Sequence, residues 1–212
     1  MIDVKICGLM DEATLAAALD GGARFIGLMF FAKSPRNVSL DRARALAAQA
    51  RGKAEIMAVT VNADDALLCA IQTAIAPDWL QLHGDETPQR VTEARAFAKT
   101  GVMKVLQIAG SADLAPASAF EGAADMLMFD AKAPPGADRP GGHGSAFDWK
   151  ILSGRRFLRP WLLSGGLNPE NVARAIGESG APGVDVSSGV ESAPGIKDAA
   201  RIAAFLSAAR SH

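Results

Sequence analysis

The sequence has 212 residues, 49% of them apolar and 21% charged, and its 22 Lys and Arg residues almost balance its 23 Asp and Glu residues. This near-neutral charge argues against nucleic acid as a partner, and no apolar stretch approaches the roughly 18 residues that a membrane span needs. We therefore expect a soluble, cytoplasmic protein without a targeting segment, folded as one domain over residues 1–212.

Short apolar runs alternate with longer helical patterns along the whole chain. The expected strands are residues 4–6, 25–30, 55–61, 79–82, 102–108, 126–129, 161–163 and 183–186. The expected helices are residues 11–19, 40–50, 65–75, 88–98, 112–120, 148–152, 168–176 and 196–209. Eight strand–helix units in a chain of this length predict an α/β fold, a single (β/α)₈ TIM barrel, with an open doubly wound sheet as the alternative. The Pro- and Gly-rich segment 131–146 is the one long loop, which favours an active-site role.

Active sites of such barrels lie at the C-terminal ends of the strands, and this rule selects Cys7 and Asp130. Cys7 ends the first strand on the same face as Lys5, and Gly8 after it leaves room for a substrate beside the sulfur. The alternative is that Cys7 is a small buried apolar residue. Asp130 closes the sixth strand, where partial burial is expected to raise its pKa enough for a general acid, unless it only caps a loop.

Polar residues at other strand ends complete the candidate site. Gln81 and His83 share the inner face of the fourth strand, where we expect them to support the site rather than carry out chemistry. Two small-residue turns follow the last two strands, where barrels often bind phosphate. Their candidate phosphate-binding residues are Gly165, Gly166, Ser187, Ser188 and Gly189.

Arg36 lies in the loop after the second strand, directly after Pro35. A guanidinium there suits a carboxylate, because its donors can bind both oxygens, although arginines are also common on surfaces. Lys132 and Arg139 in the long loop are read as solvated charges. The residues together predict a substrate with a phosphate at one end, a carboxylate at the other, and proton transfers between them.

Six motifs in order resemble those of the phosphoribosylanthranilate isomerases of tryptophan biosynthesis. They are KICGL at 5–9, SPR at 34–36, QLHG at 81–84, PGGHG at 140–144 with FDW at 147–149, LSGGL at 163–167, and GVDVSSGVE at 183–191. The resemblance covers the whole chain. The sequence departs from it at His143, where most members carry threonine, and at Ala131, where many carry threonine or serine.

The resemblance implies an Amadori rearrangement of N-(5′-phosphoribosyl)anthranilate to 1-(2-carboxyphenylamino)-1-deoxyribulose 5-phosphate, without metal or cofactor. It implies Asp130 as general acid, Cys7 as general base, and Arg36 as the ligand of the anthranilate carboxylate. A free thiol is only slightly ionised at neutral pH, so we expect the site to lower the pKa of Cys7, with Lys5 as one candidate cation. A monomer or a homodimer is expected.

Two other interpretations remain at this point. One is a different phosphosugar isomerase or synthase on the same barrel, which product analysis would identify. The other is a catalytically silent barrel that binds a sugar phosphate, although the presence of both Cys7 and Asp130 argues against it. Cys7 and Cys69 are the only cysteines and lie in unlike contexts, so neither a disulfide framework nor a zinc site is expected.

Overall fold

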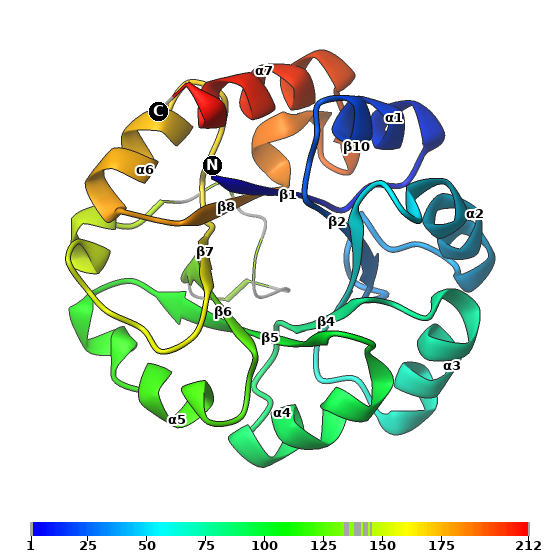
Figure 1. Cartoon of the computed structure of the whole chain (residues 1–212), viewed down its shortest axis with the longest axis horizontal. Coiled ribbons are helices and arrows are strands. Elements are labelled where there is room, and N and C mark those ends of the chain that lie inside the picture. Colours follow the sequence, from blue (N-terminus) through cyan, green and yellow to red (C-terminus); the bar gives the residue numbers. More distant parts are fainter. Residues whose placement is uncertain (1, 134–135, 138–140, 142–143, 145, 212) are drawn as a thin grey trace.

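Eight parallel strands close into a barrel in chain order, from β1 next to β2 round to β8 next to β1 (Figure 1). The computed structural model describes residues 2–133, 136–137, 141, 144 and 146–211. The barrel strands are β1 (Asp3–Cys7), β2 (Phe25–Phe30), β3 (Glu55–Thr60), β4 (Trp79–Leu82), β5 (Gly101–Ile108), β6 (Met126–Ala131), β7 (Trp161–Leu163) and β8 (Gly183–Val186). The predicted (β/α)₈ barrel is confirmed, and the open sheet is excluded because β1 pairs with both β2 and β8.

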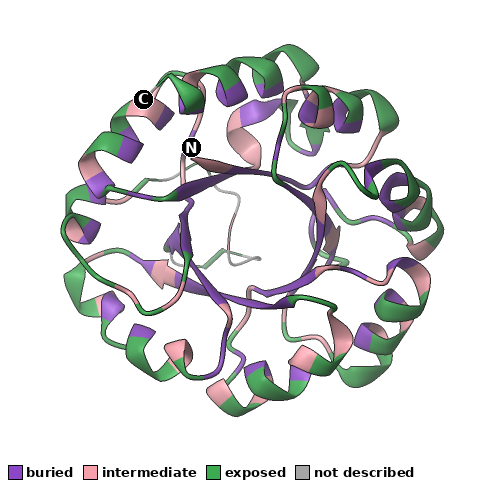
Figure 2. Ribbon diagram, viewed as in Figure 1, coloured by how far each residue is buried: buried purple, intermediate pink, exposed green. Residues whose placement is uncertain are grey.

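Helices surround the barrel and cover its outer face (Figure 1). They are α1 (Glu12–Asp20), α2 (Leu40–Ala50), α3 (Asp65–Ile75), α4 (Pro88–Ala94), α5 (Ala117–Glu121), α6 (Val172–Ser179) and α7 (Ala199–Arg210). Each buries one face against the strands and exposes the other to solvent, as Figure 2 shows. No helix in the described part of the chain has the length and apolar character to cross a membrane.

Five helix predictions differ from the structure. The predicted helix 88–98 ends as α4 at Ala94 and continues as the 3₁₀ turn Arg95–Phe97, and 168–176 is displaced to α6, Val172–Ser179. Residues 112–120 form a 3₁₀ turn, Ser111–Leu114, and then the short α5, because Pro116 lacks the amide that a continuous helix needs. Residues 148–152 form only the 3₁₀ turn Trp149–Leu152. The last helix starts at Ala199, not at residue 196, because Asp198 caps it through the amides of residues 200 and 201.

The residues just before Asp198 form a small hairpin that the sequence did not reveal. Strand β9 (Glu191–Ala193) pairs antiparallel with β10 (Ile196–Lys197). Gly195 makes the turn with φ +81°, a conformation that glycine adopts without strain. The hairpin lies beyond the C-terminal end of β8 and therefore beside the barrel mouth.

The core has two parts, separated by the sheet. Alternation along the strands directs every second side chain into the barrel. The inner cluster consists of Phe25, Met57, Trp79, Met103, Val105, Met126, Met128 and Leu162. The side chains between them, such as Ile6 and Leu80, face the helices in the larger outer cluster. Nearer the C-terminal strand ends, the inward positions become polar.

A buried ion pair ties two loops to the outer side of the sheet. Lys104, on β5, donates to Glu86 Oε2 at 2.8 Å and to the Gly84 carbonyl at 2.6 Å. Glu86 also accepts from the backbone amides of Asn62 and Gly84. Both side chains are 3% exposed, so neither charge can be left without its partner at low cost.

We expect Lys104→Met to lower the free energy of unfolding by about 3–5 kcal/mol, because it leaves the Glu86 carboxylate buried and uncompensated. Urea unfolding followed by circular dichroism measures the change. Arg44→Met, which breaks the exposed Arg44–Asp41 pair on α2, serves as control and should cost far less. Equal stability of Lys104→Met and wild type would contradict this account.

Candidate active site

The C-terminal strand ends open into one cavity of about 790 Å³, its mouth included. Its wall contains nine of the ten residues predicted for the site: Cys7, Arg36, Gln81, His83, Asp130, Gly165, Gly166, Ser187 and Ser188. These residues come from β1, β4 and β6 and from the loops after β2, β7 and β8. The fold therefore brings the predicted acid, base and anion-binding groups to a single site.

Gly189 is the exception, since it does not line this cavity. It lies in the 3₁₀ turn Ser188–Val190 and faces a neighbouring depression. A Cβ atom at this position would lie 1.9 Å from the carbonyl oxygen of Leu167. Gly189 thus allows close packing between the turns after β7 and β8, and its role in binding stays a prediction.

Cys7 is buried at the end of β1, above the buried pair of Lys5 and Asp185. Lys5 Nζ lies 2.7 Å from Asp185 Oδ1, and Ser164 donates to Asp185 Oδ2 at 3.0 Å. On the neighbouring strand, a Cβ at Gly27 would lie 2.9 Å from the sulfur. The absence of a side chain at Gly27 therefore provides the space that the Cys7 thiol occupies.

The expectation that the ligand-free site lowers the pKa of Cys7 is wrong. Burial raises the pKa of the thiol, and although the charges of Lys5 and Lys197 lower it, the Asp185 carboxylate raises it further, so the pKa lies above its ordinary value. Lys5 fails to lower the pKa enough because Asp185 neutralises it at close range. The same carboxylate, with the neighbouring thiol, outweighs burial for Lys5 and raises the pKa of the ammonium.

Asp130, at the end of β6, lies next to His83 in the cavity wall. Asp130 Oδ2 lies 3.1 Å from His83 Nε2, and Oδ1 accepts from the Ala131 amide at 2.9 Å. Gln81 Nε2 lies 3.3 Å from His83 Nδ1. A side-chain amide nitrogen only donates, so this contact fits the tautomer of His83 in which Nδ1 accepts. Gln81, His83 and Asp130 thus lie in a row along the cavity wall, and their predicted support role stays a prediction.

Two buried polar atoms of Gln81 and His83 lack a hydrogen-bond partner among the described residues. In the part of the chain that the structure describes, Gln81 Oε1 and His83 Nε2 are buried without a hydrogen-bond partner, although His83 Nε2 lies 3.1 Å from Asp130 Oδ2. Buried polar atoms without partners are rare in native proteins. Because both residues line the cavity, hydroxyl groups of a bound ligand could satisfy them.

Arg36 is buried rather than exposed, and it forms a two-pronged ion pair with Glu191 on β9. Its Nε donates to Oε1 at 2.6 Å and its Nη2 donates to Oε2 at 2.9 Å. A Cβ at Gly8, which has φ +77°, would lie 2.7 Å from Arg36 Cδ. The space beside Cys7 that we assigned to a substrate is therefore filled by the stem of Arg36.

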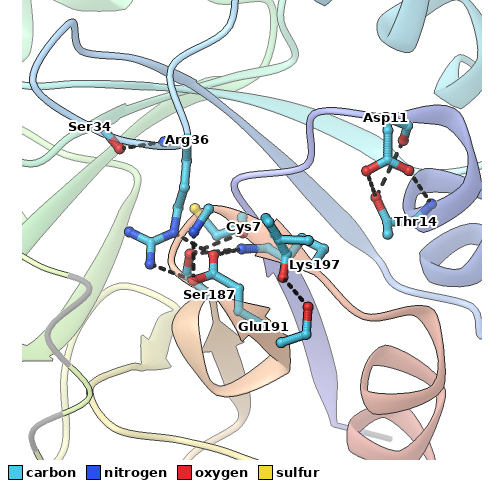
Figure 3. Close-up of polar contacts among 11 residues, drawn as sticks. Cys7, Asp11, Thr14, Ser34, Arg36, Ser187, Glu191 and Lys197 are labelled. Carbon is cyan, nitrogen blue, oxygen red and sulfur yellow. Dashed lines mark hydrogen bonds and ion pairs between the residues drawn. The ribbon is translucent and has the colours of Figure 1, made fainter.

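The turns after β7 and β8, which were predicted to bind an anion, both line the cavity. Gly165 and Gly166 have φ +90° and +65° and line the cavity. The Ser187 hydroxyl, however, already donates to the Cys7 carbonyl at 3.1 Å and accepts from Lys197 at 3.3 Å (Figure 3). The Ser187 hydroxyl therefore links the turn after β8 to β1. The Ser188 side chain takes no part in these two hydrogen bonds.

Sequence reasoning missed Asp185, Glu191 and Lys197 as parts of the site. Asp185 had a signal, because it is the only charged residue in the apolar strand β8. Glu191 and Lys197 had none, since their importance comes from Arg36, 155 residues before Glu191 in the chain. His143 and Arg139, which we singled out in the long loop, lie outside the described residues.

Comparison with known proteins decides the family. The profile of the N-(5′-phosphoribosyl)anthranilate isomerase family matches residues 4–208. This chain belongs to that family. An N-(5′-phosphoribosyl)anthranilate isomerase of Cereibacter sphaeroides is 52% identical over 209 residues, which are 99% of each chain. That of Caulobacter vibrioides is also 52% identical, over 97% of this chain and 94% of its own.

Solved structures of phosphoribosylanthranilate isomerases share the fold. The Thermotoga maritima crystal structure superposes with a TM-score of 0.89 at 33% identity over the whole of both chains. A crystal structure of the isomerase with reduced 1-(o-carboxyphenylamino)-1-deoxyribulose 5-phosphate gives 0.86 at 29% identity, again over both whole chains. The predicted family, and with it the predicted isomerase of tryptophan biosynthesis, are confirmed, while the roles of single residues stay predictions.

Alkylation tests the electrostatics of Cys7 independently of catalysis. In a Cys69→Ser variant, which removes the exposed thiol, we expect the alkylation of Cys7 by iodoacetamide to increase with pH. The midpoint should lie above that of free cysteine in the same buffer, because burial disfavours the thiolate. Mass spectrometry at timed intervals measures the rate, and a midpoint below that of free cysteine would contradict the analysis.

Proposed function

We propose that this chain catalyses the Amadori rearrangement of N-(5′-phosphoribosyl)anthranilate to 1-(2-carboxyphenylamino)-1-deoxyribulose 5-phosphate, with Asp130 as general acid and Cys7 as general base. One observation carries the proposal: a single cavity is lined by both groups, by a buried arginine and by the two glycine and serine turns. A substrate with a carboxylate at one end and a phosphate at the other would be held with its ribose carbons between acid and base.

Ring opening is the first step of the proposed mechanism. Asp130 in its protonated form donates its proton to the ribose ring oxygen, and the bond from this oxygen to C1′ breaks. The nitrogen lone pair of the substrate forms a double bond to C1′ and gives an iminium ion. His83 and Gln81 keep the Asp130 carboxyl oriented during this transfer.

Proton abstraction follows at C2′. Cys7 as thiolate removes the C2′ proton, the electron pair forms the C1′–C2′ double bond, and the iminium electrons return to nitrogen. The enolamine then loses its hydroxyl proton and gains one at C1′ to give the ketone. The substrate nitrogen supplies the electron sink, so this chemistry requires neither a metal nor a cofactor.

The pKa of Cys7 in the ligand-free site fits this sequence of steps. The thiol is protonated at rest because burial raises its pKa. A positive iminium ion formed beside it favours the thiolate, as an opposite charge at short range does. Once the ring has opened, the thiol would release its proton to solvent at the cavity mouth and act as a thiolate base, with the charges of Lys5 and Lys197 adding to the effect.

The two anchors complete the proposal. Arg36 would bind the anthranilate carboxylate with the part of its guanidinium that Glu191 does not use. Gly165, Gly166 and Ser188 would bind the phosphate through backbone amides and a hydroxyl. We also propose the cytoplasm as the compartment, since Cys7 and Cys69 are both free thiols.

We expect Cys7→Ala and Asp130→Asn each to lower kcat by two or more orders of magnitude, the range of general acid–base catalysis. The assay follows the loss of anthranilate-type fluorescence from freshly generated substrate, with spontaneous decay subtracted. Cys69→Ala, whose thiol is exposed on α3, is the matched control and should keep wild-type kcat. Near-normal turnover of Cys7→Ala or Asp130→Asn would remove that residue from the mechanism.

Arg36→Met should raise KM by about tenfold or more with a smaller change in kcat, because it removes charged hydrogen bonds to a bound carboxylate. Steady-state kinetics with the same substrate measures both constants. Unchanged KM and kcat would exclude Arg36 from substrate binding. If folded wild type fails to convert the substrate, product analysis with other aminosugar phosphates becomes the next experiment.

A further inference from the structure

The carboxylate of Glu191 holds the guanidinium of Arg36 from behind, at the wall of the cavity. We propose that Glu191 is a positioning residue for the carboxylate end of the substrate, which fixes Arg36 so that its remaining donors face the cavity. This inference rests on the proposed function, in which Arg36 binds the anthranilate carboxylate. It adds a residue, Glu191, that does not touch the substrate itself.

The contact between the two side chains has the geometry of a fixed fork. Nε and Nη2 of Arg36 each donate to a different oxygen of Glu191, at 2.6 and 2.9 Å. Two parallel bonds of this kind hold a guanidinium in one plane. The rest of the guanidinium then points away from Glu191, as Figure 3 shows.

Glu191 is itself held on its other side. Lys197 donates to Oε1 and the Gly195 amide donates to Oε2 at 3.2 Å, so each oxygen has one bond to Arg36 and one to the β9–β10 hairpin. Pairing of Glu191 with Lys197 across the two strands fixes their spacing. The carboxylate is therefore a rigid support and not a mobile counter-ion.

The hairpin is also packed against the segment that carries Arg36. A Cβ at Gly195 would lie 2.8 Å from the carbonyl oxygen of Pro35, so backbone approaches backbone at this point. Side-chain exposure is 5% for Arg36, 4% for Glu191 and 1% for Lys197. Neither the loop nor the side chain of Arg36 can move without disturbing this cluster.

Charge in the cluster favours an anionic ligand. Two cations, Arg36 and Lys197, share one carboxylate, which leaves one positive charge without a counter-ion inside the cluster. Burial raises the pKa of Glu191, but the hydrogen bond from Arg36 and the charge of Lys197 outweigh it, so the pKa lies below its ordinary value. A bound substrate carboxylate would balance the remaining charge.

Two substrates that differ only in the carboxylate test the role. We would measure kcat/KM for N-(5′-phosphoribosyl)anthranilate and for N-(5′-phosphoribosyl)aniline by chromatography of the ketose product. Wild type should prefer the anthranilate substrate. Glu191→Gln should reduce this preference by about tenfold or more, because the amide cannot accept both guanidinium bonds. For the aniline substrate, the same variant should lose less than about threefold.

Glu86→Gln is the matched control. Glu86 is also a buried, lysine-paired carboxylate near the barrel mouth, but it does not line the cavity. The Glu86→Gln variant should keep the wild-type preference between the two substrates, even if its stability changes. Circular dichroism and thermal unfolding verify the fold of each variant, and Glu191→Asp, which keeps the charge but shortens the reach, replaces Glu191→Gln if that variant does not fold.

The outcomes separate the inference from the function on which it rests. A loss of preference in Glu191→Gln alone supports positioning. An equal loss for both substrates, or a preference as strong as in wild type, overturns the role of Glu191 while the isomerase function stands. A wild type without any preference overturns the carboxylate role of Arg36, and a wild type that converts neither substrate overturns the proposed function.

Discussion

Closure of eight parallel strands into a barrel sends every second side chain of each strand to the inside, and the rest of the structure depends on this constraint. In the middle of the barrel the inward positions are large and apolar, and they pack against one another. At the C-terminal end they are Lys5, Gln81, Asp130 and Asp185, all nearly inaccessible to water. A buried charge needs a partner, so the strand ends can only be filled by a network of pairs.

That network distributes charge unevenly around the cavity. On one side, Asp185 neutralises Lys5 below the thiol of Cys7. On the other side, Arg36 and Lys197 share Glu191, so this side stays positive. At rest, burial raises the pKa of the thiol, and the Arg36 side keeps a positive charge that an anion would balance.

Periodicity predicted the strands well because it reports directly on which side chains are buried. The position of Cys7 and Asp130 at strand ends followed from the same pattern once a barrel was assumed. Predictions from local sequence were wrong where contacts between distant segments fix the backbone. The first residues of the predicted helix 196–209 form a hairpin instead, and the turn at Gly189 packs closely against the Leu167 backbone.

Residue patterns along the chain were enough to predict the alternation of strands and helices, the family through its six motifs, and the types of groups available for acid, base and anion binding. The pairing of Asp185 with Lys5, of Glu191 with Arg36 and of His83 with Asp130 became visible only in the folded barrel. The physical reason is distance along the chain: hydrophobic periodicity acts over a few residues, whereas these charges come from strands and loops that meet only when the barrel closes.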